Sequence, residues 1–302
     1  MTVNEDDALE VRFWGVRGSI PSPGSDTAIV GGNTSCVEVS GGGTRLVLDA
    51  GSGIRGLGDR LVADGAHRSV HVLLSHVHWD HVMGLPFFGP LYMPGVDLTI
   101  SAGPSGTPLR DVLKRQMSAP MFPVDFDRVG ARVRTCELPE QGSIDIGALR
   151  VTIAKLNHPD PVLAFRVSYG GRSVVYATDT EHREGEVDQT LVRLSRGADV
   201  LIYDAQYTPE EYAGEAGPSR KGWGHSTFAA GADVARAAGV KTLALFHHDP
   251  KRTDESASEI VKRSRVLFPD TVAAREGLAL RFESHSPKPL PPKPINRLAS
   301  VE

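Results

Sequence analysis

A ten-residue stretch at positions 75–84, Ser-His-Val-His-Trp-Asp-His-Val-Met-Gly, constrains this chain more than any other feature. It carries three imidazoles and one carboxylate, on His76, His78, His81 and Asp80. Imidazole nitrogen and carboxylate oxygen are ligands of zinc, and this density of both suits two neighbouring divalent ions. A surface loop that happens to be rich in His is the weaker alternative, because His and Asp are rare beside an apolar strand unless they are paired or ligating.

The residues before the cluster, 70–74, predict a buried strand, so the cluster begins where a strand ends. Side chains alternate along a strand, and if that alternation continues through Ser75, His76 and His78 point the same way. Asp80 and His81 then follow on a turn that folds back beneath them. The sequence therefore predicts a metal site at the edge of a sheet.

The length of 302 residues fits one catalytic domain, which we place at residues 1–284. Residues 285–302 contain the run Pro-Lys-Pro-Leu-Pro-Pro-Lys-Pro and predict a disordered or polyproline tail. The formal net charge of −4 argues against a protein that coats nucleic acid through bulk charge.

The two cysteines, Cys36 and Cys136, are too few for a disulfide framework, which favours a reducing cytoplasm. The acidic N-terminus lacks a basic segment followed by an apolar stretch, and no apolar run approaches the roughly 20 residues needed to span a bilayer. We expect a cytoplasmic protein without a membrane segment.

The order of predicted elements indicates the fold class. Each half of the chain begins with strands bounded by Gly, Pro or Asp, and helices come later. This order predicts an α/β fold, an αββα sandwich of two mixed β-sheets with outer helices. The predicted strands are 10–14, 34–39, 45–49, 70–75, 97–101, 131–137, 149–155, 163–168, 173–177, 201–204, 242–246 and 277–282, and the main helices are 109–117, 187–196, 227–238 and 255–266.

A pair of metal ions needs more ligands than the first cluster supplies. Three later residues follow predicted strands: His158, Asp179 and His247. An isolated Asp or His after a strand is usually a cap or a turn residue, so each is weak alone. Together with the cluster they form a complete ligand set. His248 adjoins His247, and the residues alone leave the choice between these two open.

These motifs resemble the metallo-β-lactamase superfamily, whose His-x-His-x-Asp-His motif matches residues 76–81, followed in order by a lone His, an Asp in Thr-Asp-Thr and a His after a strand. The phosphodiesterase branch, which includes ribonuclease Z, is the most similar. Its opening Gly-rich loop resembles residues 13–21, its Asp-Cys-Gly-Glu-Gly resembles residues 49–53, and its upstream His motif resembles His225-Ser-Thr. The resemblance extends to about residue 283.

The resemblance implies that one metal is held by His76, His78 and His158 and the other by Asp80, His81 and His247, with Asp179 bridging. Zinc is the expected metal, and sites of this type also accept manganese or iron. Two departures weaken a tRNA-processing interpretation. Ser52 stands where ribonuclease Z has Glu, and the chain lacks the long Gly/Pro-rich insertion with which that enzyme grips tRNA.

The sequence thus predicts a dinuclear metal-dependent hydrolase that cleaves a small or cyclic nucleotide-type phosphodiester with a metal-bridging hydroxide. Ribonuclease Z-like RNA cleavage and lactone or thioester hydrolysis on the same metals are the alternative enzymes. A binding protein that has lost turnover is the non-enzymatic alternative, and the complete ligand set argues against it. We expect a small-molecule substrate rather than RNA, and we expect no membrane partner. A homodimer is left open.

Two residues are predicted to act in catalysis. Asp80 lies beside the bridging position, where its carboxylate orients or deprotonates water, and His225 at a helix start protonates the leaving alkoxide. Asp204, after a predicted buried strand, is either a carboxylate that fixes the tautomer of a metal-ligating His or a simple turn residue. The predicted substrate contacts are Arg17, Ser19, His225 and His248.

Overall fold

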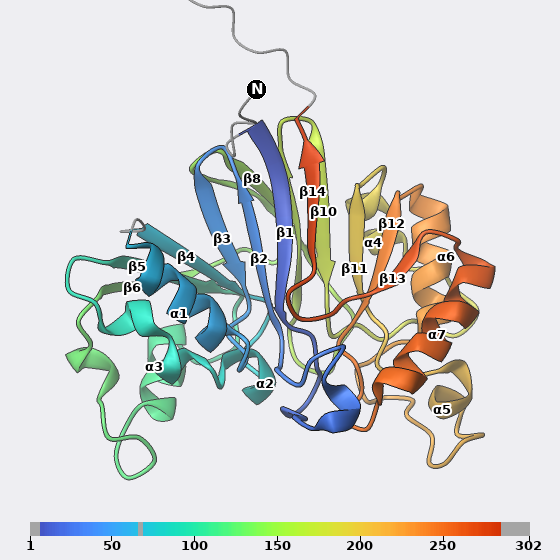
Figure 1. Cartoon of the computed structure of the whole chain (residues 1–302), viewed down its shortest axis with the longest axis horizontal. Helices are drawn as coiled ribbons and strands as arrows, with labels where there is room; N and C mark the ends of the chain where they lie inside the picture. Colours follow the sequence, from blue (N-terminus) through green and yellow to red (C-terminus); the bar gives the residue numbers. More distant parts are fainter. Residues whose placement is uncertain (1–6, 66–68, 285–302) are drawn as a thin grey trace, which may run out of the picture.

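The computed structural model describes residues 7–65 and 69–284. Two stacked sheets form its centre and helices cover their outer faces (Figure 1). The predicted αββα sandwich of mixed sheets is confirmed. The predicted Pro-rich tail lies outside the described residues.

The first sheet has the order β14-β1-β2-β3-β4-β5-β6. Pairing is antiparallel from β14 to β3 and parallel from β3 to β6. Its strands are β1 (Ala8–Gly15), β2 (Cys36–Gly41), β3 (Thr44–Leu48), β4 (Ser69–Leu74), β5 (Asp97–Ala102), β6 (Arg132–Glu137) and β14 (Ala279–Glu283). The helical segments of this half are η2 (Ser25–Thr27), α1 (Ile54–Asp64), α2 (Trp79–Val82), η3 (Leu85–Phe87), η4 (Gly89–Tyr92), α3 (Leu109–Gln116) and η5 (Phe126–Arg128).

The second sheet has the order β13-β12-β11-β10-β9-β8-β7 and repeats the pattern, antiparallel from β7 to β10 and parallel from β10 to β13. Its strands are β7 (Gly142–Ile146), β8 (Leu149–Lys155), β9 (Leu163–Tyr169), β10 (Arg172–Ala177), β11 (Val200–Asp204), β12 (Thr242–Phe246) and β13 (Thr271–Ala273). Its helices are α4 (Gln189–Ser195), α5 (Pro209–Ala213), α6 (Phe228–Ala238) and α7 (Asp254–Leu267).

Strand periodicity builds the core. Inward-facing residues of both sheets, such as Phe13, Leu48, Phe165 and Phe246, are fully buried and form one cluster between the sheets. The opposite faces pack against helices in two further clusters, one under α1 and α3 and the other under α4, α6 and α7. None of the helices described is long and apolar enough to cross a membrane.

Two strands and a short helix were not predicted from the sequence. In β7 only Ile146 is buried, so the strand lacks an apolar face, and it lies at the edge of its sheet. The three-residue strand β13 is the opposite edge and is too short for alternation to show. Helix α5 has five residues and starts at Pro209. Thr208 is its N-cap and forms a capping box with Glu211.

The predicted ligand residues follow strand ends that lie along one edge of the sandwich, at the bottom of Figure 1 near α2. His76 and His78 follow β4, His158 follows β8, Asp179 follows β10 and His247 follows β12. Carboxyl ends of parallel strands commonly form binding sites because they meet at one edge. This arrangement draws side chains from both sheets together.

Candidate metal centre

The first cluster forms a loop and one helical turn. Ser75, His76 and His78 continue from β4, and α2 then carries Asp80 and His81. The ring centroids of His76 and His78 are 4.3 Å apart, and those of His76 and His81 are also 4.3 Å apart. The turn after His78 therefore folds the second half of the motif back onto the first, as the sequence predicts.

Two groups of candidate ligand atoms lie next to each other. Within each group the atoms all lie within 4.8 Å of one another. These two groups are His76, His78, His158 and Asp179, and Asp80, His81, Asp179 and His247; a third group, of Asp179, Asp204, His225 and His247, overlaps them. The structure therefore brings together all seven predicted metal ligands, and Asp179 belongs to both groups.

Asp179 divides its two carboxylate oxygens between the groups. Its Oδ2 lies 3.6 Å from His76 Nε2, and its Oδ1 lies 3.2 Å from His81 Nε2 and 3.3 Å from His247 Nε2. Asp80 Oδ2 faces the same two nitrogens of the second group, at 3.3 and 3.1 Å. A carboxylate placed this way suits a bridge between two ions.

Each His of the two groups has a second ring nitrogen that is hydrogen-bonded elsewhere. His81 Nδ1 lies 2.7 Å from Asp49 Oδ2, and His247 Nδ1 lies 3.0 Å from Gln206 Oε1. His78 Nε2 lies 2.8 Å from Asp160 Oδ2, and the remaining contacts are His76 Nδ1 with Ser75 Oγ and His158 Nδ1 with the Asp160 carbonyl. Such contacts fix the tautomer and the ring orientation of metal-binding His residues.

Two nitrogens of the site lack hydrogen-bond partners. His76 Nε2 and His81 Nε2 are buried and unpartnered, and each points at a carboxylate oxygen of Asp179. A buried ring nitrogen without a partner is unfavourable unless another atom satisfies it. The donor set of neutral imidazoles and carboxylates fits divalent cations, which supply that partner.

The electrostatics of the site also favour cations. Burial lowers the pKa of His76 well below its usual value. Burial acts in the same direction on His81, but Asp179, Asp80 and Asp49 raise the pKa of that imidazole well above its usual value. The carboxylates that attract a proton to His81 attract a metal ion equally, and ligation replaces that proton.

His225 adjoins the second group. Its Nδ1 lies 2.9 Å from Asp204 Oδ2 and 3.9 Å from Asp179 Oδ2, and its ring stacks on that of His247 with centroids 4.9 Å apart. Burial acts to lower the pKa of His225, but Asp204, Asp179 and Asp80 raise it to about 9. Asp204 thus contacts His225, which is not one of the seven predicted ligands, and it also accepts the backbone N–H groups of Thr180 and Gln206.

The Gly-rich loop after β1 reaches the site through its backbone. The Ser19 N–H donates to Asp80 Oδ2 at 2.7 Å, and the Ser19 side chain is exposed. Ser19 has a φ of 63°, in the left-handed region that few residues other than Gly adopt. Ser19 therefore lies beside the centre, and its contact with substrate stays a prediction.

The prediction that Arg17 contacts substrate is at odds with its position. Arg17 is 0% exposed, and its guanidinium donates to the backbone carbonyls of Gly31, Asp249 and Arg252. A long cation can be buried when carbonyl oxygens accept its N–H groups. Arg17 therefore joins the loop after β1 to the segment after β12.

His248 is likewise directed away from the centre, in contrast to its predicted role in substrate binding. It is 3% exposed, and its Nε2 bonds to the Ala274 carbonyl at 3.0 Å. Burial lowers the pKa of His248 to about 4, so the ring is neutral at pH 7. Of the adjacent pair, His247 is the residue that joins a ligand group.

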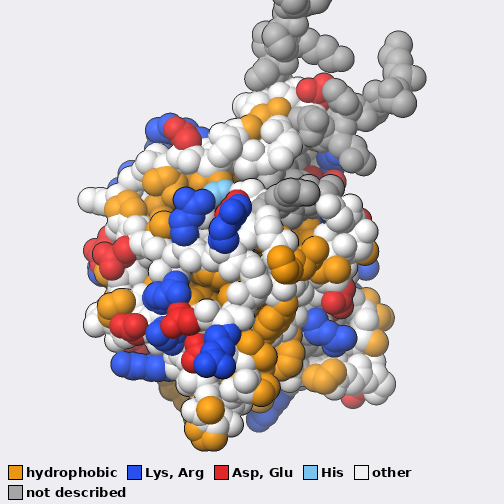
Figure 2. Space-filling view, turned by 90° about the vertical axis from the view of Figure 1, so that its left-hand side faces the viewer, with side chains coloured by type: hydrophobic (Ala, Val, Ile, Leu, Met, Phe, Trp, Pro, Cys, Tyr) orange, Lys and Arg blue, Asp and Glu red, His pale blue; other side chains and the backbone are white. Residues whose placement is uncertain are grey.

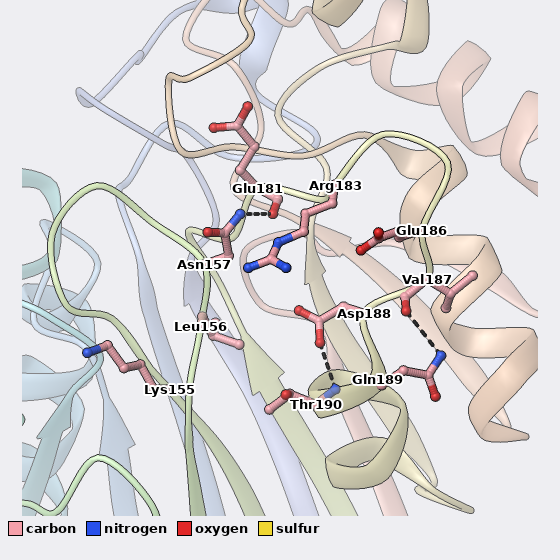
Figure 3. Close-up of a pocket in the computed structure, with 10 residues that line it drawn as sticks. All are labelled: Lys155, Leu156, Asn157, Glu181, Arg183, Glu186, Val187, Asp188, Gln189 and Thr190. Carbon is pink, nitrogen blue, oxygen red and sulfur yellow. Dashed lines mark hydrogen bonds between the residues drawn. The ribbon is translucent and has the colours of Figure 1, made fainter.

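One cavity adjoins the centre, and a second is lined by residues that neighbour two of the candidate ligands in sequence. The first, of about 200 Å³, is lined by residues that include His76, His78, Ser105 and Asp160. The other, of about 450 Å³, lies between the segment before His158 and the segment after Asp179 (Figure 3). In Figure 3 Arg183 extends into this second cavity, whereas the Glu181 carboxylate points away from it. The centre therefore has room for a small substrate beside the first ligand group.

Sequence reasoning missed the residues that orient the ligands. Asp49 accepts from Ser75 N–H, Ser75 Oγ and Tyr176 Oη as well as contacting His81. Its position in the Asp-Ala-Gly-Ser-Gly motif was a signal, because Asp at a strand end before Gly is a candidate for such a role. Asp160 and Gln206 gave no comparable signal, since each acquires its partner only through folding.

Comparison with known proteins agrees with this geometry. A family model described as a beta-lactamase superfamily domain matches residues 44–248. A ribonuclease Z of Archaeoglobus fulgidus is 24% identical, with 90% of this chain and 97% of the relative covered.

Two solved structures share the fold. The metallo-β-lactamase fold protein YhfI from Bacillus subtilis has a TM-score of 0.67 and 19% identity, covering 91% of this chain and 99% of its own. A diphosphatase from the PhnP family has a TM-score of 0.65 and 20% identity, covering 92% and 98%. With its matching family model and its buried His and Asp groups, the chain belongs to the metallo-β-lactamase superfamily, in the ribonuclease Z-like branch, and is a metal-dependent hydrolase.

Proposed function

We propose that this protein hydrolyses a small phosphodiester of the nucleotide type, including cyclic nucleotides, on two divalent ions. One ion is held by His76, His78 and His158, the other by Asp80, His81 and His247, with Asp179 as the bridge. The observation that carries the proposal is the pair of ligand groups that share Asp179, with the His225–Asp204 pair beside the second group. Zinc is the metal we expect, and manganese or iron fits the same donors.

Two divalent ions at these positions would polarise the phosphoryl oxygens and lower the pKa of water. The chain's own residues hold the reacting groups in place. The Ser19 N–H fixes one Asp80 oxygen, and Asp49 and Gln206 orient the rings of His81 and His247. Asp80 acts in this proposal as a ligand whose carboxylate also orients the attacking water.

His225 supplies the proton for the leaving group. With its Nδ1–H donating to Asp204, the Nε2 atom is the one that delivers a proton to the departing alkoxide. The side chain is 13% exposed, so a substrate atom can reach it. Asp204, Asp179 and Asp80 raise the pKa of His225 and so favour its protonated form, and bound cations would oppose that shift.

Three observations favour a small substrate over RNA. The cavity on the first ligand group is about 200 Å³, and the chain lacks a long Gly/Pro-rich insertion. On the face shown in Figure 2, where α3 and β6 lie, basic side chains lie beside acidic ones. Arg110 and Lys114 both pair with Asp127, and Arg132 pairs with Asp97. Paired charges of this kind reduce the attraction of a long polyanion.

RNA cleavage is the second candidate, because the relatives named ribonuclease Z match most of the chain. The two candidates share their metal chemistry and differ in the size of the substrate they admit. Hydrolysis of a lactone or thioester is the third outcome that the same pair of ions could support.

A panel assay of the metal-reconstituted protein tests the proposal. The substrates are bis-p-nitrophenyl phosphate, a 3′,5′-cyclic nucleotide, a precursor tRNA and an acyl lactone, each with zinc, manganese or iron. We expect turnover of the two small diesters and none of the tRNA. Trimming of the precursor tRNA without cyclic nucleotide turnover would establish the second candidate, and lactone hydrolysis alone would overturn the phosphodiester assignment.

A further inference from the structure

Arg220, a cation on the loop before His225, has no acidic partner among the described residues. Lys221, Arg252 and Arg263 each form an ion pair with a glutamate. The Arg220 side chain, which is half-buried, makes no hydrogen bond or ion pair to another residue in the described part of the chain. Its N–H donors are therefore available to a ligand.

Aromatic rings hold this guanidinium in place. Arg220 Cζ lies 4.4 Å from the centroid of the Trp223 ring and 5.8 Å from that of Tyr207. Both distances are within the range of a cation–π contact. Tyr207 is buried, whereas Trp223 is 54% exposed, so one part of the indole faces solvent. The Arg220 guanidinium is thus held in place by stacking, while its N–H groups form no hydrogen bond to another described residue.

The loop that carries these residues is anchored to the metal centre. The Glu181 carboxylate accepts the N–H groups of Gly222 and Gly224, at 2.7 and 2.8 Å, and the Tyr212 hydroxyl at 2.7 Å. Figure 3 shows this carboxylate directed away from the cavity below it. Because Glu181 follows Asp179 by two residues, the loop is fixed relative to the bridging ligand.

The same loop packs against two residues of the site. A Cβ on Gly224 would lie 2.5 Å from the His158 ring, so the backbone next to Trp223 touches a metal ligand. The Tyr207 ring, which stacks with Arg220, lies edge-on to the His225 ring with centroids 6.0 Å apart. Arg220 and Trp223 therefore lie close to His225, the proposed proton donor to the leaving group.

We propose that Arg220 and Trp223 bind the nucleotide part of the substrate. The exposed part of the Trp223 indole stacks on the base, and the Arg220 guanidinium donates hydrogen bonds to phosphate oxygens. Planar bases stack on tryptophan whatever their identity, and a guanidinium matches two phosphate oxygens at once. The inference rests on the proposed function, because it names the substrate group that this centre accepts.

Binding measurements test the site without turnover. Isothermal titration calorimetry compares adenosine 5′-monophosphate with ribose 5-phosphate, which differ only in the base. We expect the nucleotide to bind the wild-type protein roughly 5- to 150-fold more tightly, as one stacked base contributes. The Trp223→Ala variant should lose this preference and Trp223→Phe should keep most of it. Equal affinities in wild type, or a preference that survives in Trp223→Ala, would overturn the role of Trp223.

The guanidinium has its own test. Arg220→Ala should weaken binding of both ligands by a similar factor, of roughly 10-fold, because both carry the phosphate. Arg193→Ala, which removes an exposed arginine of α4, is the matched control and should bind both ligands like wild type. Unchanged binding by the Arg220→Ala protein would exclude a phosphate contact.

A pair of chromogenic diesters separates this inference from the proposed function. Thymidine 5′-(p-nitrophenyl phosphate) and methyl p-nitrophenyl phosphate share a leaving group and differ in the nucleoside. We expect Trp223→Ala to lower kcat/KM for the first roughly 10-fold and to change that for the second less than about 2-fold. If the Trp223→Ala protein hydrolyses both diesters with no selective loss on the thymidine compound, the inference is contradicted and the proposed function is not. If the wild-type protein hydrolyses neither diester, the proposed function is contradicted, and the binding measurements alone decide whether Trp223 and Arg220 form a site.

Discussion

At the scale of single residues, the centre depends on which nitrogen of each imidazole is free. Asp49, Gln206 and Asp160 occupy one nitrogen of His81, His247 and His78, so the other nitrogen is left to face a cation. Three residues at the centre also have unusual backbones. Asp49, Asp179 and His247 have φ angles of 62°, 52° and 58°. Non-Gly residues adopt such angles at a cost of about 1–3 kcal/mol each, and they concentrate at functional sites.

His225 gives a prediction that distinguishes proton donation from a structural role. A p-nitrophenolate leaves without a proton, whereas an alkoxide requires one. The His225→Gln protein should therefore lose about 10²- to 10⁴-fold in kcat on a cyclic nucleotide and much less on bis-p-nitrophenyl phosphate. Steady-state kinetics measures both, and metal analysis should show wild-type metal content. Equal losses on the two substrates would rule out the role of general acid.

Gly18 gives a prediction about the last ligand. A Cβ at this position would lie 2.6 Å from the Cε1 and Nδ1 atoms of His247, closer than atoms can approach. Gly18→Ala should therefore displace the ring and lower the metal content by about one equivalent per chain, as mass spectrometry of the purified protein would measure. Gly24→Ala is the matched control, because its nearest atom is 3.9 Å away, and it should bind metal normally. Full occupancy in Gly18→Ala would argue against His247 as a ligand.

At the scale of elements, the sequence predicts most of the architecture for a physical reason. Strands such as Leu149–Lys155 and Thr242–Phe246 have buried residues on one face or both, and apolar patterning specifies these segments directly. The edge strands Gly142–Ile146 and Thr271–Ala273 bury too little to leave a pattern. The edge strands Arg132–Glu137 and Ala279–Glu283 of the first sheet also have no fully buried residue, but apolar or β-branched residues alternate with charged ones along them, and both were predicted.

The same distinction applies to the site. Its candidate ligands are identified by their chemical type and by their positions after strands, so all seven could be named from sequence. Arg17 and His248 were assigned to substrate because they adjoin the motifs, yet their side chains turn into the protein. Arg220 and Trp223 lie on an irregular loop, where spacing says nothing about which way a side chain points.

Asp199 links three segments of the second sheet. It precedes β11 and accepts from the Ser173 N–H at 2.9 Å, Arg172 Nη1 at 3.0 Å and Lys241 Nζ at 2.7 Å. Burial acts to raise the pKa of Asp199, but these donors hold it below its usual value. A lowered pKa in the folded state means that the ionised carboxylate stabilises the fold above the unfolded pKa, about 3.9, and that this contribution is lost as the pH falls toward the folded pKa.

Asp199→Asn should therefore lower the free energy of unfolding by about 1–3 kcal/mol at pH 7. The difference between the variant and wild type should shrink as the pH falls below about 4. Urea titrations at several pH values measure both effects. A difference that stays constant down to the lowest pH at which the protein folds would show that Asp199 does not act through its charge.

At the scale of the whole molecule, the centre connects the two sheets. The first sheet supplies the residues after β4, and the second supplies those after β8, β10 and β12. Between the sheets lies an apolar cluster, and a few hydrogen bonds such as Tyr176 Oη to Asp49 Oδ2 also cross from one sheet to the other. Ions held by both sheets stabilise the folded chain over the unfolded one, because the ligands come together only in the fold.

Removal of metal should thus lower the melting temperature. We expect excess EDTA to reduce the Tm of the loaded protein by roughly 5–15 °C, as differential scanning calorimetry would measure. The Asp179→Ala protein, which lacks the proposed bridge, should show a much smaller change with EDTA. If the wild-type Tm is the same with and without chelator, the ions do not join the sheets.

The place of His247 after β12, the twelfth strand along the chain, has a consequence for synthesis on the ribosome. The first ligand group is complete once Asp179 has emerged, but the second waits until the chain beyond β12 has left the exit tunnel. Domains fold as their chain becomes available. A nascent chain that stops before β12 can therefore assemble no more than the first ligand group, and both ligand groups are present together only in a polypeptide that has been translated beyond β12.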